Sequence, residues 1–258
     1  MKKFLALLCA AMLLMTVCAA ALADSDMDYV KANGKLVVGI TDFEPMDYQD
    51  ADGNWIGFDA DMATAFAESL GVAVEFIEID WDNKILELNS KAVDCIWNGM
   101  TLTDEVTSSM ECTNAYMNNA QVIVIKADKA ADYDSVEAMS GLSFAVESGS
   151  AGEACINELG YACTPVSSQA AALMEVAAGT SDAAVIDSLM AAAMVGEGTS
   201  YADLTYTYAL NSEEYGVGFR QGSDLAAALN DFFAASAANG VSETIAETYG
   251  VQAALIAE

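Results

Sequence analysis

The hydrophobic positions of this chain follow strand and helix periods in turn. Three short apolar runs are typical of buried strands: "KLVVGI" at residues 35–40, "VAVEFIEI" at 72–79 and "VDCIW" at 93–97. Met62, Phe66 and Leu70 recur at every fourth position, which predicts an amphipathic helix, and Gly71 follows as a natural helix end. A second helix is expected at about residues 83–90. Strands that alternate with helices predict a mostly parallel sheet.

The same order is repeated after "KADKAADYD", residues 126–134, a polar stretch that we interpret as a linker. Further strands are predicted at "AQVIVI", "LSFAV", "ACTPV" and "AAVI", with helices between them. The tail offers a strand, "YGVGF" at residues 215–219, a helix over about 224–238 and a short terminal helix. These are too few elements for a third domain, so we expect them to complete the first α/β unit.

The N-terminus has the composition of a secretory signal peptide. Two lysines precede an apolar run over residues 4–17, and small residues flank Leu22 as in an A-x-A cleavage site. The run is short and rich in alanine for a membrane span. We therefore expect residues 1–23 to be removed. The alternative is a lipid anchor on Cys18, which Val17 disfavours because such signals normally have Gly or Ala at that position.

Composition restricts the partners. The chain has 9 basic and 39 acidic residues, a formal net charge of −30, which disfavours nucleic acid and anionic membranes as partners. A hydrophobic fraction of 54% favours a compact fold.

Four cysteines follow the expected cleavage site: Cys95, Cys112, Cys155 and Cys163. An oxidising compartment would allow two disulfides, and Cys155 with Cys163 is the first candidate pair. The alternative is four buried free thiols. No C-x-x-C motif is present, so a redox motif or thiolate metal site is not expected.

The chain lacks the residues that several kinds of catalytic and cofactor-binding site require. The chain has no histidine, which excludes Ser-His and Cys-His nucleophiles. No phosphate-binding loop or G-x-G-x-x-G motif is present, and we expect no cofactor. The segment "YQDADGNWIGFD" resembles a calcium loop, but Tyr48 stands at the first ligand position, so a β-hairpin is favoured and no metal is expected.

Three polar segments follow predicted parallel strands, at the usual ligand edge of an α/β sheet: "DWDNK", "NGMTLT" and "DSLM". They offer the aromatic face of Trp81, a free amide at Gly99, a free hydroxyl at Thr101 and the carboxylate of Asp187. Each has a structural alternative, in which Trp81 is a core residue and Thr101 and Asp187 are helix caps.

Six segments in this order resemble the polar amino-acid-binding proteins of ABC importers, the extracellular solute-binding proteins of family 3: "KLVVGITDFEPMDY", "GFDADMATAFAESLGV", "DWDNKILELNSKAVDCIWNGMTLTDE", "GLSFAVESGSA", "SDAAVIDS" and "YGVGFRQGSD". The resemblance implies an α/β, two-lobed periplasmic-binding-protein-like fold (type II), with two crossing strands and a ligand in the cleft between the lobes. The corresponding bounds are 24–121 for the first part of lobe 1, 122–126 for a hinge strand, 127–206 for lobe 2 and 207–258 for the return. It also implies a monomer that hands its ligand to a membrane permease.

The resemblance assigns roles to seven residues. Phe43 and Trp81 would be aromatic walls and Asp187 the partner of the ligand's ammonium group. The residues expected to contact the ligand's polar groups are Gly99, Thr101, Gly149 and Ser150.

One departure stands in "WNGMTLTDEVTSSMEC". Family members usually carry an arginine that clamps the ligand's carboxylate where this chain has Val106, and a hydroxyl at the position of Ala151 is also lost. The single arginine, Arg220, is expected in the returning strand of the first lobe, away from the clamp position. Lys84 is the nearby cation that would replace the clamp, although a surface pair with Glu87 also explains it.

The other explanation is a ligand without a carboxylate. Such an amine or other cation would be held by Asp187, with Asp42 and Glu147 as further candidates, and by aromatic faces. The acidity of the chain mildly favours this explanation through electrostatic steering.

The first hypothesis is therefore an exported receptor that is not an enzyme. It would capture a small polar solute, an amino acid or an amine, for an ABC importer. A dehydratase-like extracytoplasmic enzyme and a sensor of the same fold are the alternatives.

Overall fold

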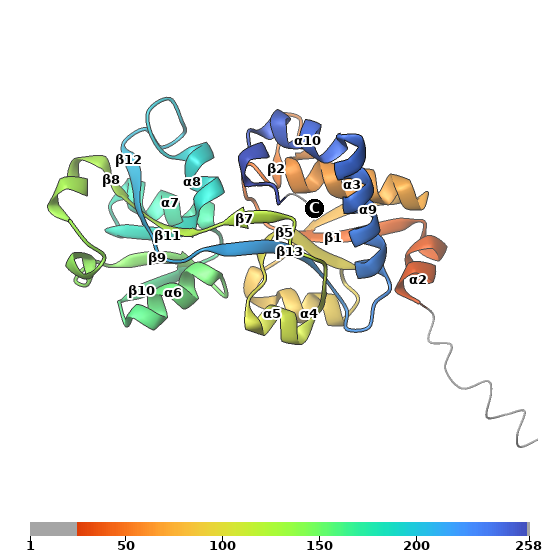
Figure 1. Cartoon of the computed structure of the whole chain (residues 1–258). Coiled ribbons are helices and arrows are strands. Elements are labelled where there is room, and N and C mark those ends of the chain that lie inside the picture. Colours follow the sequence, from red (N-terminus) through yellow and green to blue (C-terminus); the bar gives the residue numbers. More distant parts are fainter. Residues whose placement is uncertain (1–24, 257–258) are drawn as a thin grey trace, which may run out of the picture.

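The computed structural model describes residues 25–256, which form two α/β lobes lying side by side (Figure 1). The expected signal peptide 1–23 and Cys18 lie outside the described residues. Between residues 25 and 256, no helix is long and apolar enough to cross a membrane.

The first lobe is built on a sheet of strand order β4-β1-β5-β13-β6, and β7 also pairs with β13. Its strands are β1 (Lys35–Ile40), β4 (Ala73–Glu78), β5 (Cys95–Thr101), β6 (Glu111–Cys112), β7 (Met117–Asn119) and β13 (Glu213–Phe219). Its helices are α2 (Asp26–Asn33), α3 (Phe58–Leu70), α4 (Lys84–Asn89), α5 (Asp104–Ser109), α9 (Leu225–Asn239) and α10 (Val241–Tyr249), with the 3-10 turns η1 (Trp81–Asn83) and η4 (Gln252–Ala254). Figure 1 shows α3, α9 and α10 on one face of this sheet and α4 and α5 on the other.

Helix α3 confirms the predicted apolar face. Met62 and Phe66 are 1% exposed and pack in the core, and Leu70 is partly buried against it. Each such side chain contributes about 1.5–3 kcal/mol by leaving water. Gly71 ends the helix with φ of 76°, a left-handed conformation that glycine adopts without steric cost.

The second lobe has strand order β10-β9-β11-β8-β12. Its strands are β8 (Gln121–Lys126), β9 (Phe144–Glu147), β10 (Cys163–Val166), β11 (Ala183–Asp187) and β12 (Leu204–Ala209). Its helices are α6 (Ala151–Leu159), α7 (Gln169–Ala178) and α8 (Ser188–Met194), with the 3-10 turns η2 (Ala127–Asp132) and η3 (Glu137–Met139). The stretch 126–134 is therefore not a linker, because η2 packs against β8 and β12 and the Ala127 N–H donates to the Asp203 carbonyl at 2.9 Å.

Both sheets are mixed rather than mostly parallel. β1 is parallel to β4 and β5, and β9 is parallel to β10 and β11, as expected. β13 runs antiparallel to β5, and β8 runs antiparallel to β11. The antiparallel strands are the ones whose chain arrives from the other lobe, a long-range connection that local periodicity does not encode.

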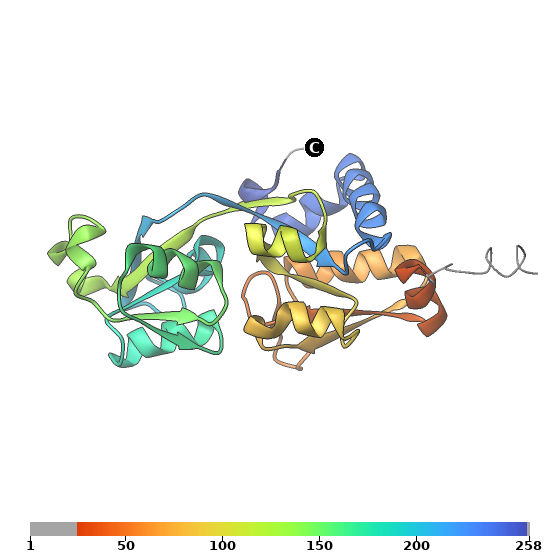
Figure 2. The same cartoon turned by 90° about the horizontal axis from the view of Figure 1, so that it is seen from below.

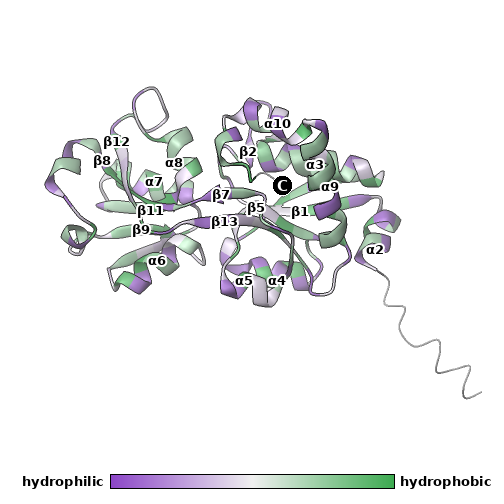
Figure 3. Cartoon of the chain, in the orientation of Figure 1, coloured by the Kyte–Doolittle hydropathy of each residue, from purple (hydrophilic) through white to green (hydrophobic). Residues whose placement is uncertain are grey.

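Two short connections join the lobes, and Figure 2 shows them side by side. Only Ala120 separates β7 from β8, and residues 210–212 separate β12 from β13. The connections are bonded to each other, since the Leu210 N–H donates to the Gln121 carbonyl at 2.8 Å. The expected hinge strand 122–126 is instead part of β8, which pairs with β11 and β12 inside the second sheet. Hydrophilic residues gather on β7 and β13 where they approach the second lobe (Figure 3).

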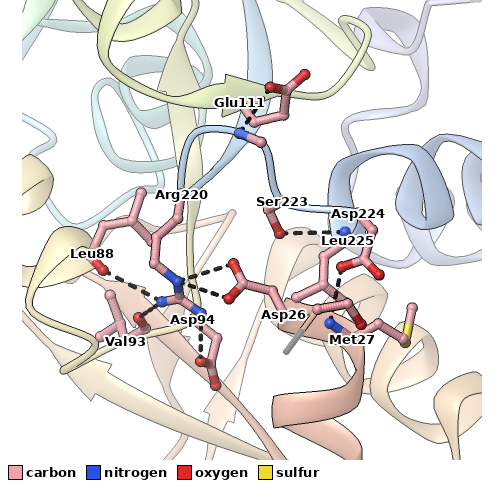
Figure 4. A network of polar contacts seen from close by, with 12 residues as sticks. Asp26, Met27, Leu88, Val93, Asp94, Glu111, Arg220, Ser223, Asp224 and Leu225 are labelled. Atoms are coloured by element: carbon pink, nitrogen blue, oxygen red, sulfur yellow. Dashed lines mark hydrogen bonds and ion pairs between the residues drawn. The ribbon is translucent and has the colours of Figure 1, made fainter. Parts of the chain in front are cut away.

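Arg220 follows β13 and ties the first lobe together (Figure 4). Its Nε donates to the Asp26 carboxylate at 3.0 Å and its Nη2 to Asp94 at 3.1 Å, and its Nη1 donates to the Val93 carbonyl at 2.8 Å. The single arginine of the chain is thus committed to structure, away from the interlobe cleft, as expected.

The segment resembling a calcium loop is a hairpin, as favoured. β2 (Tyr48–Gln49) pairs antiparallel with β3 (Trp55–Ile56). Among residues 25–256, no group of three or more His, Cys, Asp or Glu side chains is placed to hold a metal ion.

Candidate interlobe binding site

A cleft of about 960 Å³ lies between the lobes. All eight residues expected at the site line it: Phe43, Trp81, Lys84, Gly99 and Thr101 from the first lobe and Gly149, Ser150 and Asp187 from the second. Its acidic lining residues are Asp104, Glu105, Glu147, Glu158, Asp187, Glu213 and Glu214. Lys84 is the only basic one among the described lining residues, so acidic residues strongly outnumber basic ones in the cleft.

Two of the acidic residues that line the cleft have buried carboxylates, Asp187 and Glu213. Asp187 ends β11 and is 4% exposed, and Glu213 begins β13 and is 9% exposed. The amide of Gln121 bridges them, donating to Glu213 Oε1 at 2.8 Å and to Asp187 Oδ1 at 3.1 Å. The Asn119 amide bonds both as well, and the Tyr215 hydroxyl donates to Asp187 Oδ1 at 2.5 Å. The two lobes therefore meet through a shared carboxylate–amide network.

Other donors complete the network. Gln169 donates its side-chain amide to Asp187 Oδ2 and accepts the Asp187 N–H at 2.8 Å. The Thr101 hydroxyl donates to Glu213 Oε1 at 2.9 Å, and Asn211 donates to Glu213 Oε2 at 2.7 Å. Asp187 is the N-cap residue of α8, as the structural alternative expected, but its carboxylate makes no capping hydrogen bond to that helix and bonds the cleft amides instead.

Glu147, at the end of β9, is a third buried carboxylate of the cleft, with an exposure of 3%. Its Oε1 has no hydrogen-bond partner among the described residues. Burial, and then the charge of Asp187, raise the pKa of Glu147 to about 8. Burial, and then the charge of Glu213, raise the pKa of Asp187 to about 7. Both shifts arise because carboxylates that share a buried site resist ionisation together, and a bound cation would relieve this.

Lys84 is a buried interlobe contact. It is 6% exposed, and its Nζ donates to the Gly149 carbonyl of the second lobe at 2.9 Å and to the Trp81 carbonyl at 3.2 Å. The Nζ atom also lies 5.0 Å from the centroid of the Trp81 ring. Burial lowers the pKa of Lys84. The interpretation of Lys84 as a surface partner of Glu87 is wrong, because the α4 helix begins with Lys84 turned into the cleft.

The lobes also approach each other closely at Gly149. A Cβ atom there would lie 2.8 Å from Asp82 Cα, and Gly149 has φ of 71°. Any side chain at this position would push the second lobe away from η1, so glycine is needed both for its conformation and for the close approach.

The expected backbone donors already have acceptors. The Gly99 N–H donates to the buried Asp59 carboxylate at 2.6 Å, and the Gly149 N–H donates to Glu153 Oε2 at 2.7 Å. Ser150 caps α6, with its hydroxyl oxygen accepting the Glu153 N–H at 3.1 Å. The expectation that the Gly99 amide and Thr101 hydroxyl are free was wrong, because their acceptors lie on distant parts of the chain.

Aromatic and apolar side chains form the remaining walls. Phe43 is 2% exposed and stands edge-on to Tyr215, with ring centroids 6.4 Å apart. Trp81, 7% exposed, both packs in an apolar cluster and lines the cleft, so its two interpretations are compatible. Val106, 3% exposed, adds an apolar patch to the lining.

Two interpretations from the sequence were wrong: Asp42 as a residue of the cleft and Thr101 as a helix cap. Asp42 lines a separate, smaller pocket of about 300 Å³ with Glu44 and Glu78, not the main cleft. The helix cap before α5 is Thr103 rather than Thr101, because the Thr103 hydroxyl accepts the Val106 N–H at 3.2 Å.

The candidate disulfide is absent. Cys95, Cys112, Cys155 and Cys163 are all free thiols in the described part of the chain. The Cys163 thiol instead contacts Asn157 Oδ1 at 3.7 Å.

Sequence reasoning did not single out several polar residues of the site: Asn119, Gln121, Gln169, Asn211, Glu213 and Tyr215. Most of them lie at or beside the two connections between the lobes. One signal in the sequence could have identified them: polar residues that lie directly next to the apolar strands "QVIVIK" and "YGVGF".

Comparisons with known proteins agree with this architecture. The family model of bacterial extracellular solute-binding proteins, family 3, matches residues 36–252. The arginine-binding extracellular protein ArtP of Bacillus subtilis (strain 168) is 30% identical over 196 residues, covering 74% of this chain and 75% of that protein.

Two solved structures are similar over most of their length. A mutant of ArgBP from T. maritima has a TM-score of 0.81 and 30% identity, covering 87% of this chain and 98% of that chain. The ancestral amino acid-binding protein AncCDT-1, a precursor of cyclohexadienyl dehydratase, has a TM-score of 0.80 and 30% identity, covering 87% of this chain and 99% of that chain. The two-lobed α/β fold expected from the sequence is thereby confirmed.

Proposed function

This chain belongs to the bacterial extracellular solute-binding proteins, family 3, and we propose that it captures a small, positively charged solute in its interlobe cleft and delivers it to an ABC importer. The observation that carries the proposal is the cluster of buried carboxylates Asp187, Glu213 and Glu147, faced by Lys84 as the one basic lining residue of the described cleft. The ligand is an amino acid or an amine.

A cation is the ligand that this site favours physically. Three buried carboxylates repel one another and have lost their water, and an ammonium or guanidinium group between them offsets both costs. In this proposal Asp187 and Glu147 contact the cation, and Glu213 fixes Asp187 through shared amides. Phe43 and Trp81 flank the ligand as aromatic walls, and Gly99, Thr101, Gly149 and Ser150 shape the cleft. The likeness to ArtP, an arginine-binding protein, supports a cationic amino acid as one candidate class.

The proposed capture involves closure of the lobes. Short connections such as Ala120 allow a hinge motion, and the Lys84 to Gly149 hydrogen bond joins the two sides of the cleft. The proposed protein is exported after removal of residues 1–23 and acts as a monomer with a membrane permease as its partner. Binding rather than catalysis is proposed because the cleft is built from hydrogen-bonded carboxylates, and the family match supports transport rather than sensing.

The test is ligand binding with closure by the chain that begins at Asp24. Cationic amino acids and amines are screened by thermal shift, and small-angle scattering measures compaction. A ligand at 100 times its dissociation constant adds about 2.7 kcal/mol, which should raise Tm by roughly 5–10 °C. The matched control pair is Asp187→Asn, which should lose the response, and Asp42→Asn, outside the cleft, which should keep it.

The proposal is wrong if neither class stabilises the protein, or if a ligand binds without compaction. Turnover of prephenate-like acids would identify the dehydratase alternative instead.

A further inference from the structure

Three donors that a ligand carboxylate would use in this cleft are already engaged. The Gly99 and Gly149 N–H groups donate to Asp59 and Glu153, and the Thr101 hydroxyl donates to Glu213. A carboxylate requires several converging donors to leave water, and taking these would strip hydrogen bonds from carboxylates of the protein, of which Asp59 and Glu213 are buried.

The side-chain amides lining the cleft are engaged in the same way. Each of them donates to an acceptor of the protein: Asn98, Asn118, Gln121, Gln169 and Asn211. Most of these bonds hold Asp187 or Glu213, so the amides are used to support negative charge that is already there.

Lys84 does not replace the missing donors for a ligand carboxylate. Two of its three N–H groups donate to the carbonyls of Trp81 and Gly149. The one N–H that is left is a single contact, and a bound carboxylate would also face Glu147, Asp187 and Glu213, which repel it.

One acceptor, by contrast, has no donor. Glu147 is 3% exposed, and its Oε1 has no partner in the described part of the chain. It lines the cleft with Asp187, which ends the neighbouring strand of the same sheet. Phe43, Trp81 and Val106 provide apolar walls that suit methylene groups and the faces of cations.

We propose that the solute bound in this cleft is an amine or guanidino compound that carries no carboxylate group. This inference rests on the proposed function, the capture of a cationic solute, and selects the amine over the amino acid. The ammonium or guanidinium group donates to the carboxylates of Asp187 and Glu147, and the carbon chain lies against the aromatic walls.

The test compares ligand pairs that differ only in the carboxylate: agmatine with arginine, cadaverine with lysine, putrescine with ornithine and histamine with histidine. Dissociation constants are measured by calorimetry on the full mature chain, with scattering to detect closure. At least one amine should bind at least about tenfold more tightly than its amino acid, a difference of about 1.4 kcal/mol. Arginine amide, which keeps the α-ammonium group of arginine but has no carboxylate charge, should also bind more tightly than arginine.

A variant pair tests the geometry. Glu147→Gln should weaken amine binding by about tenfold or more, because it removes the charge that faces the ammonium group. Asp42→Asn, the same kind of change outside the cleft, should leave binding unchanged.

The outcomes separate this inference from the proposed function. If each amino acid that binds does so as tightly as its amine or more tightly, with compaction, the inference is wrong and the proposed function stands. If neither member of any pair binds, both are overturned.

Discussion

The Lys84 ammonium group of the first lobe donates a hydrogen bond of 2.9 Å to the Gly149 carbonyl of the second lobe. The sequence suggested Lys84 as a substitute for a missing carboxylate clamp, but the structure uses it to join the lobes. We therefore expect Lys84 to stabilise the closed arrangement of the lobes, whichever ligand is bound.

Lys84→Met should lower the affinity for every ligand by a similar factor. The variant loses a charged hydrogen bond between the lobes, a contribution of about 1.5–3 kcal/mol, and so roughly a 10- to 150-fold change in affinity. Calorimetry on arginine and agmatine measures it. A loss of affinity confined to amino acids would identify Lys84 as a carboxylate partner and contradict its role in joining the lobes.

Gly149→Ala should impair closure. The added Cβ would lie 2.8 Å from Asp82 Cα, so the closed arrangement is blocked and affinity should fall by about tenfold or more. Gly160→Ala is the matched control, because Gly160 has the same φ of 71° and nothing within 4 Å of its Cβ. Both variants should lose similar stability in thermal melts, whereas only Gly149→Ala should lose compaction by scattering. Equal binding by the two would exclude a role for this contact.

The ligand-free protein should lose stability as pH rises from about 4 to 8. Asp187 and Glu147 have pKa values of about 7 and 8 in the folded protein, above their ordinary 3.8 and 4.5, so the folded state binds more protons than the unfolded state in this window. Each group therefore lowers the unfolding free energy by up to about 1.4 kcal/mol per pH unit. Asp59, with a pKa of about 7, acts in the same direction in the first lobe.

A bound amine should reverse part of this loss. Because the cation favours ionised carboxylates, the ligand-induced rise in Tm should grow between pH 5 and pH 8.5. Thermal melts with and without agmatine measure it, and Glu147→Gln should reduce the growth. A rise in Tm that is independent of pH would show that these carboxylates do not contact the ligand.

Arg220→Met should destabilise the first lobe without changing the cleft. The variant leaves Asp94, 2% exposed, and Asp26 without their cation, which typically costs about 3–5 kcal/mol. Chemical denaturation should show the loss, and ligand affinity below the unfolding transition should match that of the unchanged protein. A matching loss of affinity would mean that this network reaches the binding site.

The elements could be predicted where the signal is local. β1 occupies the predicted residues 35–40, and Gly71 ends α3 as expected, because apolar periodicity and glycine at a helix end act within a few residues. The rule that ligands bind at the carboxyl ends of parallel strands also selected Trp81 and Gly99 from the first sheet and Asp187 from the second, and all three line the cleft.

Tertiary structure decided how those residues are bonded. Gly99 donates to Asp59, 40 positions away, and Thr101 donates to Glu213, 112 positions away. The mixed sheets and the folding of residues 126–134 into the second lobe likewise depend on strands that return from far along the chain.

The sequence by itself determined the two α/β units, the electronegative character of the chain and the residues available for the cleft. Only the tertiary structure decided which hydrogen-bond donors are engaged and which carboxylate is left with a free oxygen. The physical reason is that secondary structure follows from neighbouring residues, whereas the hydrogen-bonding state of a buried polar group depends on partners that folding brings from distant positions.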